Sequence, residues 1–209
     1  MNTQTQPATG PGADPVLEQK IQELQGLYAD APELAKTALE HLLPELASQG
    51  SEAASQMTSA GRSGSRQGKV SELTMIAPFA PGGAKRLRGL LRLADGKFIE
   101  AEKVGTVHDM RFVFLDNDTK LLFATAYDGE WDPYIDDFVA KVPDFLDMIF
   151  SALEGWPGIH SPSVKDWITN HQVTAEGWYV ANPNSTVLET RRLVRVGQAL
   201  DEFLDKISG

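Results

Sequence analysis

A short stretch near the middle of the chain combines three ionisable side chains with a run of large apolar ones. His108, Asp109 and Arg111 lie within residues 105–115, which read GTVHDMRFVFL and predict a β-strand. Because strand side chains alternate between faces, we expect His108 to share a face with Met110, and Asp109 with Arg111. Ionisable groups in a buried strand need partners, so all three are candidate catalytic residues lining a pocket. The alternative is a structural ion-pair cluster near the sheet end.

Aromatic side chains form a second group of candidates, near a predicted junction between a strand and a helix. Tyr127 ends the predicted strand 121–127, Trp131 follows four residues later, and Trp178 belongs to another predicted strand. Large aromatic rings often wall apolar ligand pockets, so these three residues are candidate ligand-binding residues. Their alternative role is that of ordinary core residues.

Carboxylates occupy every second position at the same junction. Asp128, Glu130 and Asp132 offer the oxygen ligands that Mg²⁺ and Ca²⁺ prefer, but their spacing fits no known calcium loop. We therefore predict no metal site, and we keep Asp128 as a candidate ligand-binding residue. Asp132 before Pro133 is typical of a helix start, where Asp132 would act as the cap. Hydrolytic chemistry through these acids would need a bound divalent ion.

The composition excludes several classes of function. The chain has 209 residues, no cysteine and a formal net charge of −10. Without thiols there can be no disulfide, zinc–thiolate site or cysteine nucleophile. The acidic balance argues against nucleic acid or an anionic membrane as a partner. The first residues lack the apolar run of a secretory signal, and no segment has the ~20 apolar residues that span a bilayer, so we predict a cytoplasmic protein.

The N-terminal third predicts three segments of different character. Residues 1–14 are rich in Gly, Pro, Thr and Gln, which predicts disorder. Over residues 15–47, apolar side chains recur at helical spacing and predict a helical hairpin, with Pro44 bending or ending its second helix. Residues 48–69 are rich in Ser, Gly and Ala and predict a flexible linker to a domain over residues 70–209.

That domain is predicted to be of the α+β class. Its main strands and helices alternate in the order β, α, β, β, α, β, α, over residues 72–78, 84–94, 105–115, 121–127, 132–155, 176–181 and 186–207. Pro143 is expected to kink or break the helix over residues 132–155, and Thr186 and Glu189 predict a capping box at the start of the last helix. The first six elements match a ferredoxin-like βαββαβ core with helices on one sheet face. The strands are apolar on both faces, so we expect the other face to pair with a second copy in a dimeric α+β barrel.

Five sequence blocks resemble a bacterial family of uncharacterised proteins, whose members read HFARW, LLFxSNYDGxWxxYLxDF, GFP, FxxWxxxHQ and WYxAxPxLTV. The matching residues here are 108–112, 121–138, 155–157, 164–172 and 178–187. The chain departs from this pattern at Asp109 and Met110, where the family tends to have Phe and Ala. The sheet order is similar to that of the dimeric α+β barrel class, which includes haem peroxidases and small monooxygenases. This similarity makes haem a candidate cofactor, by analogy of fold.

Two functions follow as hypotheses. The first is a small-ligand or cofactor-binding domain of redox or oxygenase type, with its site around His108, Arg111, Tyr127 and Trp178. The second is a non-catalytic assembly or adaptor protein that docks a protein partner through residues 15–47. Both hypotheses are compatible with a homo-oligomer.

Overall fold

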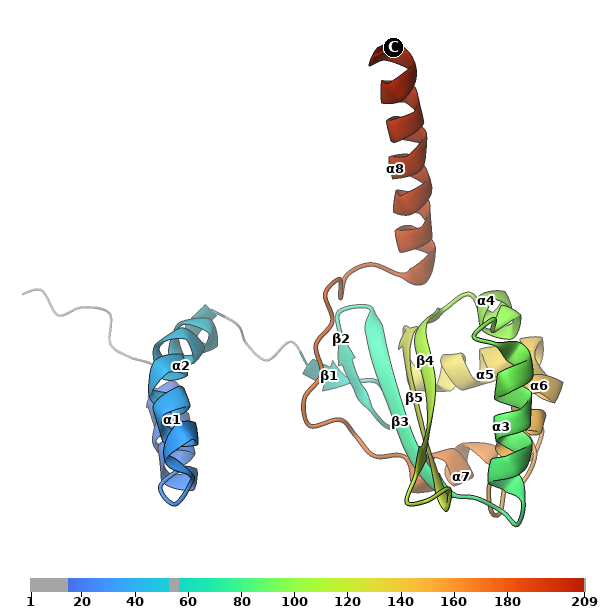
Figure 1. Cartoon of the computed structure of the whole chain (residues 1–209), viewed down its shortest axis with the longest axis horizontal. Helices are drawn as coiled ribbons and strands as arrows, with labels where there is room; N and C mark the ends of the chain where they lie inside the picture. Colours follow the sequence, from blue (N-terminus) through green and yellow to red (C-terminus); the bar gives the residue numbers. More distant parts are fainter. Residues whose placement is uncertain (1–14, 53–56, 209) are drawn as a thin grey trace, which may run out of the picture. The chain divides into compact units, whose positions relative to one another are not determined.

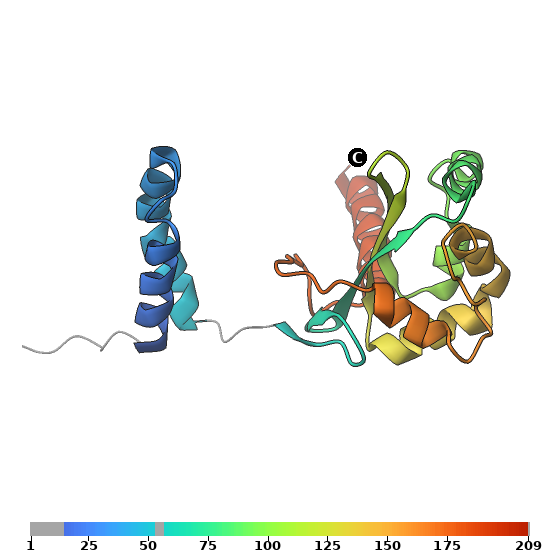
Figure 2. The same ribbon diagram turned by 90° about the horizontal axis from the view of Figure 1, so that it is seen from below.

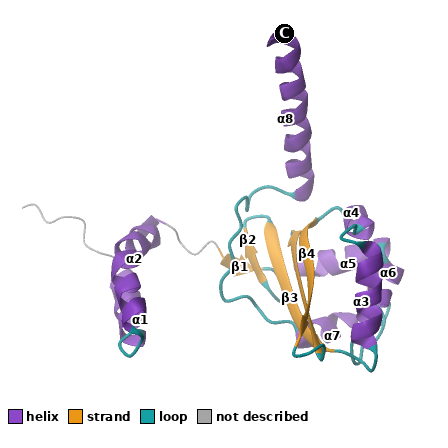
Figure 3. Cartoon of the chain, in the orientation of Figure 1, coloured by secondary structure: helices purple, strands orange, loops and turns teal. Residues whose placement is uncertain are grey.

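Turns rich in Gly, Asp and Pro divide the chain into helices and one antiparallel sheet, in a computed structural model that describes residues 15–52 and 57–208. The structure is mixed α and β, and it divides into two compact units over residues 1–56 and 57–209. Figure 1 labels the elements and Figure 3 distinguishes them by type. The disorder predicted for residues 1–14 lies outside the described residues, as do residues 53–56 of the predicted linker.

A helical hairpin forms the first unit, as the apolar periodicity predicts. Helix α1 (Pro15–Leu27) packs against α2 (Glu33–Glu52), which continues past Pro44. The half-buried apolar side chains recur every three or four positions within each helix: Leu17, Ile21, Leu24, Ala35, Leu39 and Leu43. None of the described side chains of the hairpin is fully buried, because two helices alone cannot enclose a core.

A five-stranded antiparallel sheet lies at the centre of the second unit. Its strands are β1 (Met57–Ser59), β2 (Ser65–Gln67), β3 (Val70–Pro78), β4 (Val107–Leu115) and β5 (Lys120–Asp128). Their spatial order is β1-β2-β3-β5-β4, so β5 lies between the two long strands that precede it in sequence. The three long strands β3, β4 and β5 correspond to the first three predicted strands.

Helices cover one face of this sheet. They are α3 (Gly83–Ala94), α4 (Ile99–Val104), α5 (Trp131–Lys141), α6 (Pro143–Phe150) and α7 (Val164–His171). Figures 1 and 2 show them on the same side of the strands. The helix predicted over residues 132–155 is interrupted at Val142, where Pro143 begins α6, because proline lacks the amide that would continue α5. The short helix α4 was not predicted.

Rows of cross-strand partners build the core beneath these helices. Partners in neighbouring antiparallel strands point to the same face, and Met75, Phe123 and Phe112 form one such row across β3, β5 and β4. Phe150 of α6 packs edge-on against Phe123, with 5.3 Å between the ring centroids. Burial of these large side chains supplies the main driving force for folding of the domain.

The structure does not have the predicted βαββαβ order. Residues 176–181, the predicted fourth strand, lie in the loop after α7, which runs along the edge of β3 up to Ala175 and then contacts β2 at Trp178. The backbone amide of Val173 donates to the carbonyl of Thr74 over 2.8 Å, but regular pairing does not continue from there. Part of this edge is already occupied by β2, where Arg66 pairs with Ser71. A strand at this position would have to displace β2.

Part of the segment predicted to be a flexible linker, residues 48–69, belongs to the sheet instead. Residues 57–67 form β1 and β2, which extend the sheet beyond β3, and Ala60 and Ser65 are buried. The two strands are short and polar, so apolar periodicity carried no signal for them. Backbone hydrogen bonds within the sheet, rather than buried apolar side chains, hold these two strands in place.

The last helix, α8 (Val187–Ser208), agrees with the helix predicted over residues 186–207. Figure 1 shows it extending away from the sheet. Apart from Val187, none of its described side chains is buried. Among the described helices, none is long and apolar enough to cross a lipid bilayer.

Candidate functional site

A β-bulge in β4 determines where the candidate catalytic histidine points. The pairing of β4 with β5 shifts between Val107 and Asp109, so His108 is the extra residue of the bulge. As a result Val107, rather than His108, shares the helix-covered face with Met110: their partners Tyr127 and Thr125 lie two residues apart in β5. The alternation predicted for this end of the strand was therefore wrong.

The bulge brings His108 to the carboxylate of Asp128. The Nε2–H group of His108 donates to Oδ1 of Asp128 over 2.7 Å, and the Asp128 side chain is only 11% exposed. The second oxygen, Oδ2, accepts the backbone amide of Val187 over 2.9 Å. Val187 begins α8, and a helix N-terminus stabilises a carboxylate through its free amides and its dipole. Asp128 therefore joins β4 to the start of α8.

A second carboxylate holds the same end of α8. Glu189 accepts the backbone amide of Thr186 over 2.8 Å, and the Thr186 hydroxyl accepts the amide of Glu189, which is the predicted capping box. Lys69 donates to Glu189 over 2.8 Å. The hydrogen bond from Lys69, followed by those from Thr186, lowers the pKa of Glu189 to about 2. We call His108, Asp128, Lys69 and Glu189 the α8 clamp.

A shallow groove lies beside this clamp. Its volume is about 150 Å³, and it is lined by Phe98, Ala101, Glu102, Val107, His108, Asp109, Met110 and Arg191. Pockets for drug-sized ligands usually have volumes of roughly 300–1,000 Å³, so the groove accommodates only a small group. Its charged side chains carry both signs, which gives no clear preference for an anion or a cation.

The third candidate catalytic residue, Arg111, forms its ion pair with Asp109 and not with the cluster of His108 and Asp128. Arg111 pairs with Asp109 over 3.2 Å, and both side chains are largely exposed on the sheet face opposite the helices. An exposed ion pair of this kind contributes little to stability. The structural alternative therefore fits Arg111 better than a role in a shared pocket with His108.

The candidate ligand residue Tyr127 is a core residue in the structure. It is fully buried, and its ring stacks on that of Tyr134 with 3.7 Å between centroids and 13° between planes. Burial raises the pKa of both tyrosine hydroxyls above their ordinary range, so both remain neutral. Neither hydroxyl is therefore suited to serve as a base near neutral pH.

The two candidate tryptophans lie in different surroundings. Trp131 is fully buried, and its Nε1–H group donates to Oε1 of Gln172 over 2.9 Å. The guanidinium of Arg62 lies over the Trp131 ring at 5.5 Å. Trp178 is half-buried in the loop after α7, where its backbone carbonyl accepts the side chain of Gln67 over 2.7 Å. The two tryptophans therefore belong to separate packing environments.

The acidic residues that follow Tyr127 do not converge. Asp128 turns to His108, whereas Glu130 pairs with Arg66 at 3.6 Å and Asp132 with Lys165 at 2.9 Å. The hydrogen bond from Lys165 lowers the pKa of Asp132. Asp132 lies inside α5, one residue after its first, so it is not the helix cap that its position before proline suggested. Within residues 15–52 and 57–208, no group of three or more metal-ligating side chains is found.

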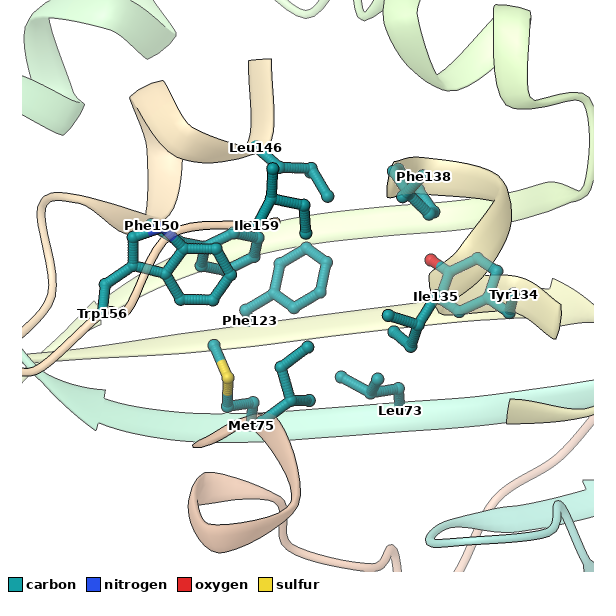
Figure 4. A pocket seen from close by; sticks show the side chains of 11 residues that line it. Leu73, Met75, Phe123, Tyr134, Ile135, Phe138, Leu146, Phe150, Trp156 and Ile159 are labelled. Carbon is teal, nitrogen blue, oxygen red and sulfur yellow. The ribbon is translucent and has the colours of Figure 1, made fainter. Parts of the chain in front are cut away.

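A small cavity in the core is also too small for a typical ligand. A cavity of about 30 Å³ lies between the sheet and α5 and α6. Figure 4 shows its lining, which includes Leu73, Met75, Phe123, Tyr134 and Phe150. This volume corresponds to about one water molecule. The sheet-lined pocket expected around His108, Tyr127 and Trp178 is not formed by these residues.

A buried acid that sequence reasoning missed is Glu72 of β3, which is only 4% exposed. Its carboxylate accepts hydrogen bonds from the amide of Ser65, the hydroxyl of Thr74 and the amide of Ala175. It thereby joins β2, β3 and the loop after α7. The signal for this role is a lone charged residue in a strand of mostly apolar residues.

Chemically, the pair of His108 and Asp128 resembles the oriented imidazole of a general base. A reacting system also needs a nucleophile or a substrate pocket, and no described hydroxyl contacts the imidazole. Both oxygens of Asp128 are engaged, one by His108 and the other by Val187. The arrangement therefore serves to fix the start of α8. Comparison of the chain with protein-family models, curated proteins and solved structures gives no match.

Proposed function

We propose that this chain is a non-catalytic assembly protein whose α+β domain presents α8 to a partner helix. The observation that carries this proposal is the contrast between the two parts of α8. Its first turn is tied to the domain by the α8 clamp. Beyond Val187, all described side chains are outside the core, although many are large and apolar.

The apolar side chains of α8 favour an amphipathic helix as the partner. Those that recur along one side of the helix are Leu193, Val196, Leu200, Phe203 and Ile207, which we call the α8 stripe. Contiguous apolar surface of this kind usually marks an interaction site on a soluble protein. Two helices bury such stripes by packing their apolar sides together.

The helical hairpin supports the same class of function. In the hairpin, Leu27, Leu34 and Leu42 are exposed in addition to the half-buried seam between the helices. The docking of a protein partner through residues 15–47 stays a prediction. The dimeric α+β barrel, in which two copies would pair their open sheet faces, also stays a prediction.

A small-ligand site at the groove beside His108 is the second candidate function. The observation that favours it is the imidazole held by Asp128 over 2.7 Å. Against it stands the groove volume of about 150 Å³, which is far too small to enclose a haem. An absorption spectrum and a haem titration of the purified full chain test this candidate. Saturable haem binding that His108→Ala abolishes would favour it over assembly.

Affinity purification from the source cells tests the assembly function. The stripe variant Leu193→Gln/Leu200→Gln is compared with the control variant Leu188→Gln/Val194→Gln, which changes two exposed apolar residues outside the stripe. We expect the wild type and the control to retain the same proteins, further copies of the chain included, and the stripe variant to lose them. Equal retention by all three would show that α8 is not the docking element.

A further inference from the structure

We infer that α8 pairs with α8 of a second copy of this chain, with the two helices antiparallel. This inference rests on the assembly function proposed above and names the partner of the same surface. Three features of α8 carry it: the spacing of its stripe, the distribution of its charges and the small residues near its middle.

The α8 stripe has the spacing of a coiled-coil seam. Its members, Leu193, Val196, Leu200, Phe203 and Ile207, are separated by three, four, three and four residues. This alternation places every member on one seam of two helices that pack with knobs in holes. Each of these side chains is more than half exposed in the structure, so the seam is available to a second helix.

The charges of α8 are divided between its two halves. The N-terminal half carries Arg191, Arg192 and Arg195, and its single acid, Glu189, is paired with Lys69. The C-terminal half carries three acids, Asp201, Glu202 and Asp205, with Lys206 as its single basic residue. In a parallel pair, arginines would face arginines and acids would face acids, and such like-charge contacts are unfavourable. In an antiparallel pair, each basic half lies along the acidic half of the other copy.

Small residues near the middle of α8 fit the same arrangement. Gly197 and Ala199 lie in the sequence between Val196 and Leu200 of the stripe, each next to one of them. Glycine is a poor residue for a helix interior, and no neighbouring atom within its own domain requires the absence of a side chain at Gly197. A second helix that crosses here would approach closely because both residues are small.

The α8 clamp makes such a pair more favourable. An isolated helix gains little stability in water, because the cost of ordering it must be met by the contacts it forms. The contacts of Asp128 and Glu189 hold the first turn in helical conformation before any partner binds. The ordering cost of association is correspondingly smaller.

The first experiment measures the mass of the full chain by sedimentation over a range of concentrations. We expect a monomer–dimer equilibrium that the control variant Leu188→Gln/Val194→Gln preserves. The stripe variant Leu193→Gln/Leu200→Gln should weaken dimerisation by at least about tenfold, since two large apolar residues leave the interface. Circular dichroism and the thermal midpoint show whether each variant retains its folded domain. Equal dissociation constants for the two variants would overturn the inference.

Charge reversal tests the pairing of unlike halves. An acidic variant, Arg192→Glu/Arg195→Glu, and a basic variant, Asp201→Lys/Asp205→Lys, should each be mainly monomeric. Mixed in equal amounts, they should form a heterodimer, because opposite charges then face each other along the whole seam. A mixture that stays monomeric, while each variant keeps its fold, would contradict the charge argument.

Crosslinking determines the orientation, and the absence of native cysteines makes it direct. In an antiparallel pair centred on the small residues, Leu193→Cys of one copy lies opposite Phe203→Cys of the other. Under mild oxidation the mixture of these two single variants should give the mixed disulfide dimer, while Leu193→Cys alone should give little dimer. Efficient self-crosslinking of Leu193→Cys would indicate a parallel pair and overturn the inference.

Hydrogen exchange separates failure of this inference from failure of the proposed function. A monomer whose α8 amides are protected would mean that another part of the same chain covers α8, which contradicts pairing between copies. A monomer with unprotected α8 amides also contradicts the pairing. The proposed function would then still be decided by the proteins that the stripe variant loses in affinity purification.

Discussion

Asp128 accepts the imidazole N–H of His108 over 2.7 Å with one carboxylate oxygen, and with the other it accepts the first amide of α8. A candidate catalytic residue and a candidate ligand-binding residue thus together join the sheet to the last helix. Changes to either side chain should therefore alter the stability and the orientation of α8. This expectation can be measured residue by residue.

Replacement of Asp128 by Asn is expected to loosen the base of α8. An amide side chain keeps one oxygen, so it cannot accept from both the His108 ring and the Val187 amide in the present geometry. We expect a loss of about 1–3 kcal/mol and faster hydrogen exchange in the first turn of α8. Asp109→Asn is the control, because Asp109 is exposed and paired only at the surface. An equal effect of both changes would refute the special role of Asp128.

Acid should weaken the pairing of Lys69 with Glu189 in the α8 clamp over a defined range of pH. The pKa of Glu189 is lowered from 4.5 to about 2 in the folded chain, chiefly by Lys69 and then by Thr186. A lowered pKa means that its stabilising contribution is complete above about pH 4.5 and is lost as the pH falls toward 2. The protection factors of the first α8 amides, which compare each exchange rate with that of an unstructured amide at the same pH, should therefore fall between these values. Glu189→Gln should remove this part of the pH dependence, and an unchanged profile would contradict the assignment.

Glu72→Gln should destabilise the domain by about 1–3 kcal/mol. The buried carboxylate accepts from Ser65, Thr74 and Ala175, whereas glutamine offers one acceptor oxygen and adds two donors that need partners. Denaturant unfolding measures the loss, and exchange at β2 should increase with it. Glu176→Gln, an exposed change, is the matched control and should be close to neutral.

Alanine variants of one buried and one exposed phenylalanine should distinguish effects on folding from effects on assembly. Phe123 is 7% exposed in the core and Phe203 is 57% exposed on α8. We expect Phe123→Ala to cost about 3–5 kcal/mol of domain stability through lost contacts and a cavity. Phe203→Ala should change domain stability by no more than about 0.5 kcal/mol but should weaken self-association. Reversed effects on denaturant unfolding and sedimentation would show that α8 belongs to the domain core.

Two glycines of α3 should respond to alanine in opposite directions. A side chain at Gly83 would meet the backbone carbonyl of Ala152, whereas none of the neighbouring atoms lies near a side chain built at Gly89. We expect Gly83→Ala to destabilise the domain by about 1–3 kcal/mol because backbone must shift. Gly89→Ala should stabilise it by about 0.5–1 kcal/mol through helix propensity. Thermal unfolding of both variants compares these effects directly.

Local signals predicted much of the secondary structure correctly. Apolar periodicity predicted the three long strands and the last helix, and Pro143 marked the break between α5 and α6. The capping box of Thr186 and Glu189 was readable because it depends on residues three positions apart. The strand predicted over residues 176–181 failed because an alternating pattern cannot show whether the sheet edge is already occupied.

In the candidate site, too, local signals were readable in the sequence, whereas contacts between distant segments were not. Sequence identified His108 and Asp128 separately, but their hydrogen bond depends on a β-bulge that shifts the register by one residue. Glu72 gave only the general signal of an acid among apolar residues, because its partners lie 7 and 103 positions away for Ser65 and Ala175. Pairing between such distant segments is a property of the folded chain.

By itself, the sequence determined the α+β class, the absence of thiol chemistry, the helical hairpin and the presence of the last helix. Those properties follow from composition and from interactions between residues three or four positions apart. The tertiary structure alone decided that His108 holds Asp128, that β2 pairs with the start of β3, and that Asp128 and Lys69 hold the first turn of α8. The physical reason is that register, bulges and buried hydrogen bonds join segments whose separation in sequence carries no local signal.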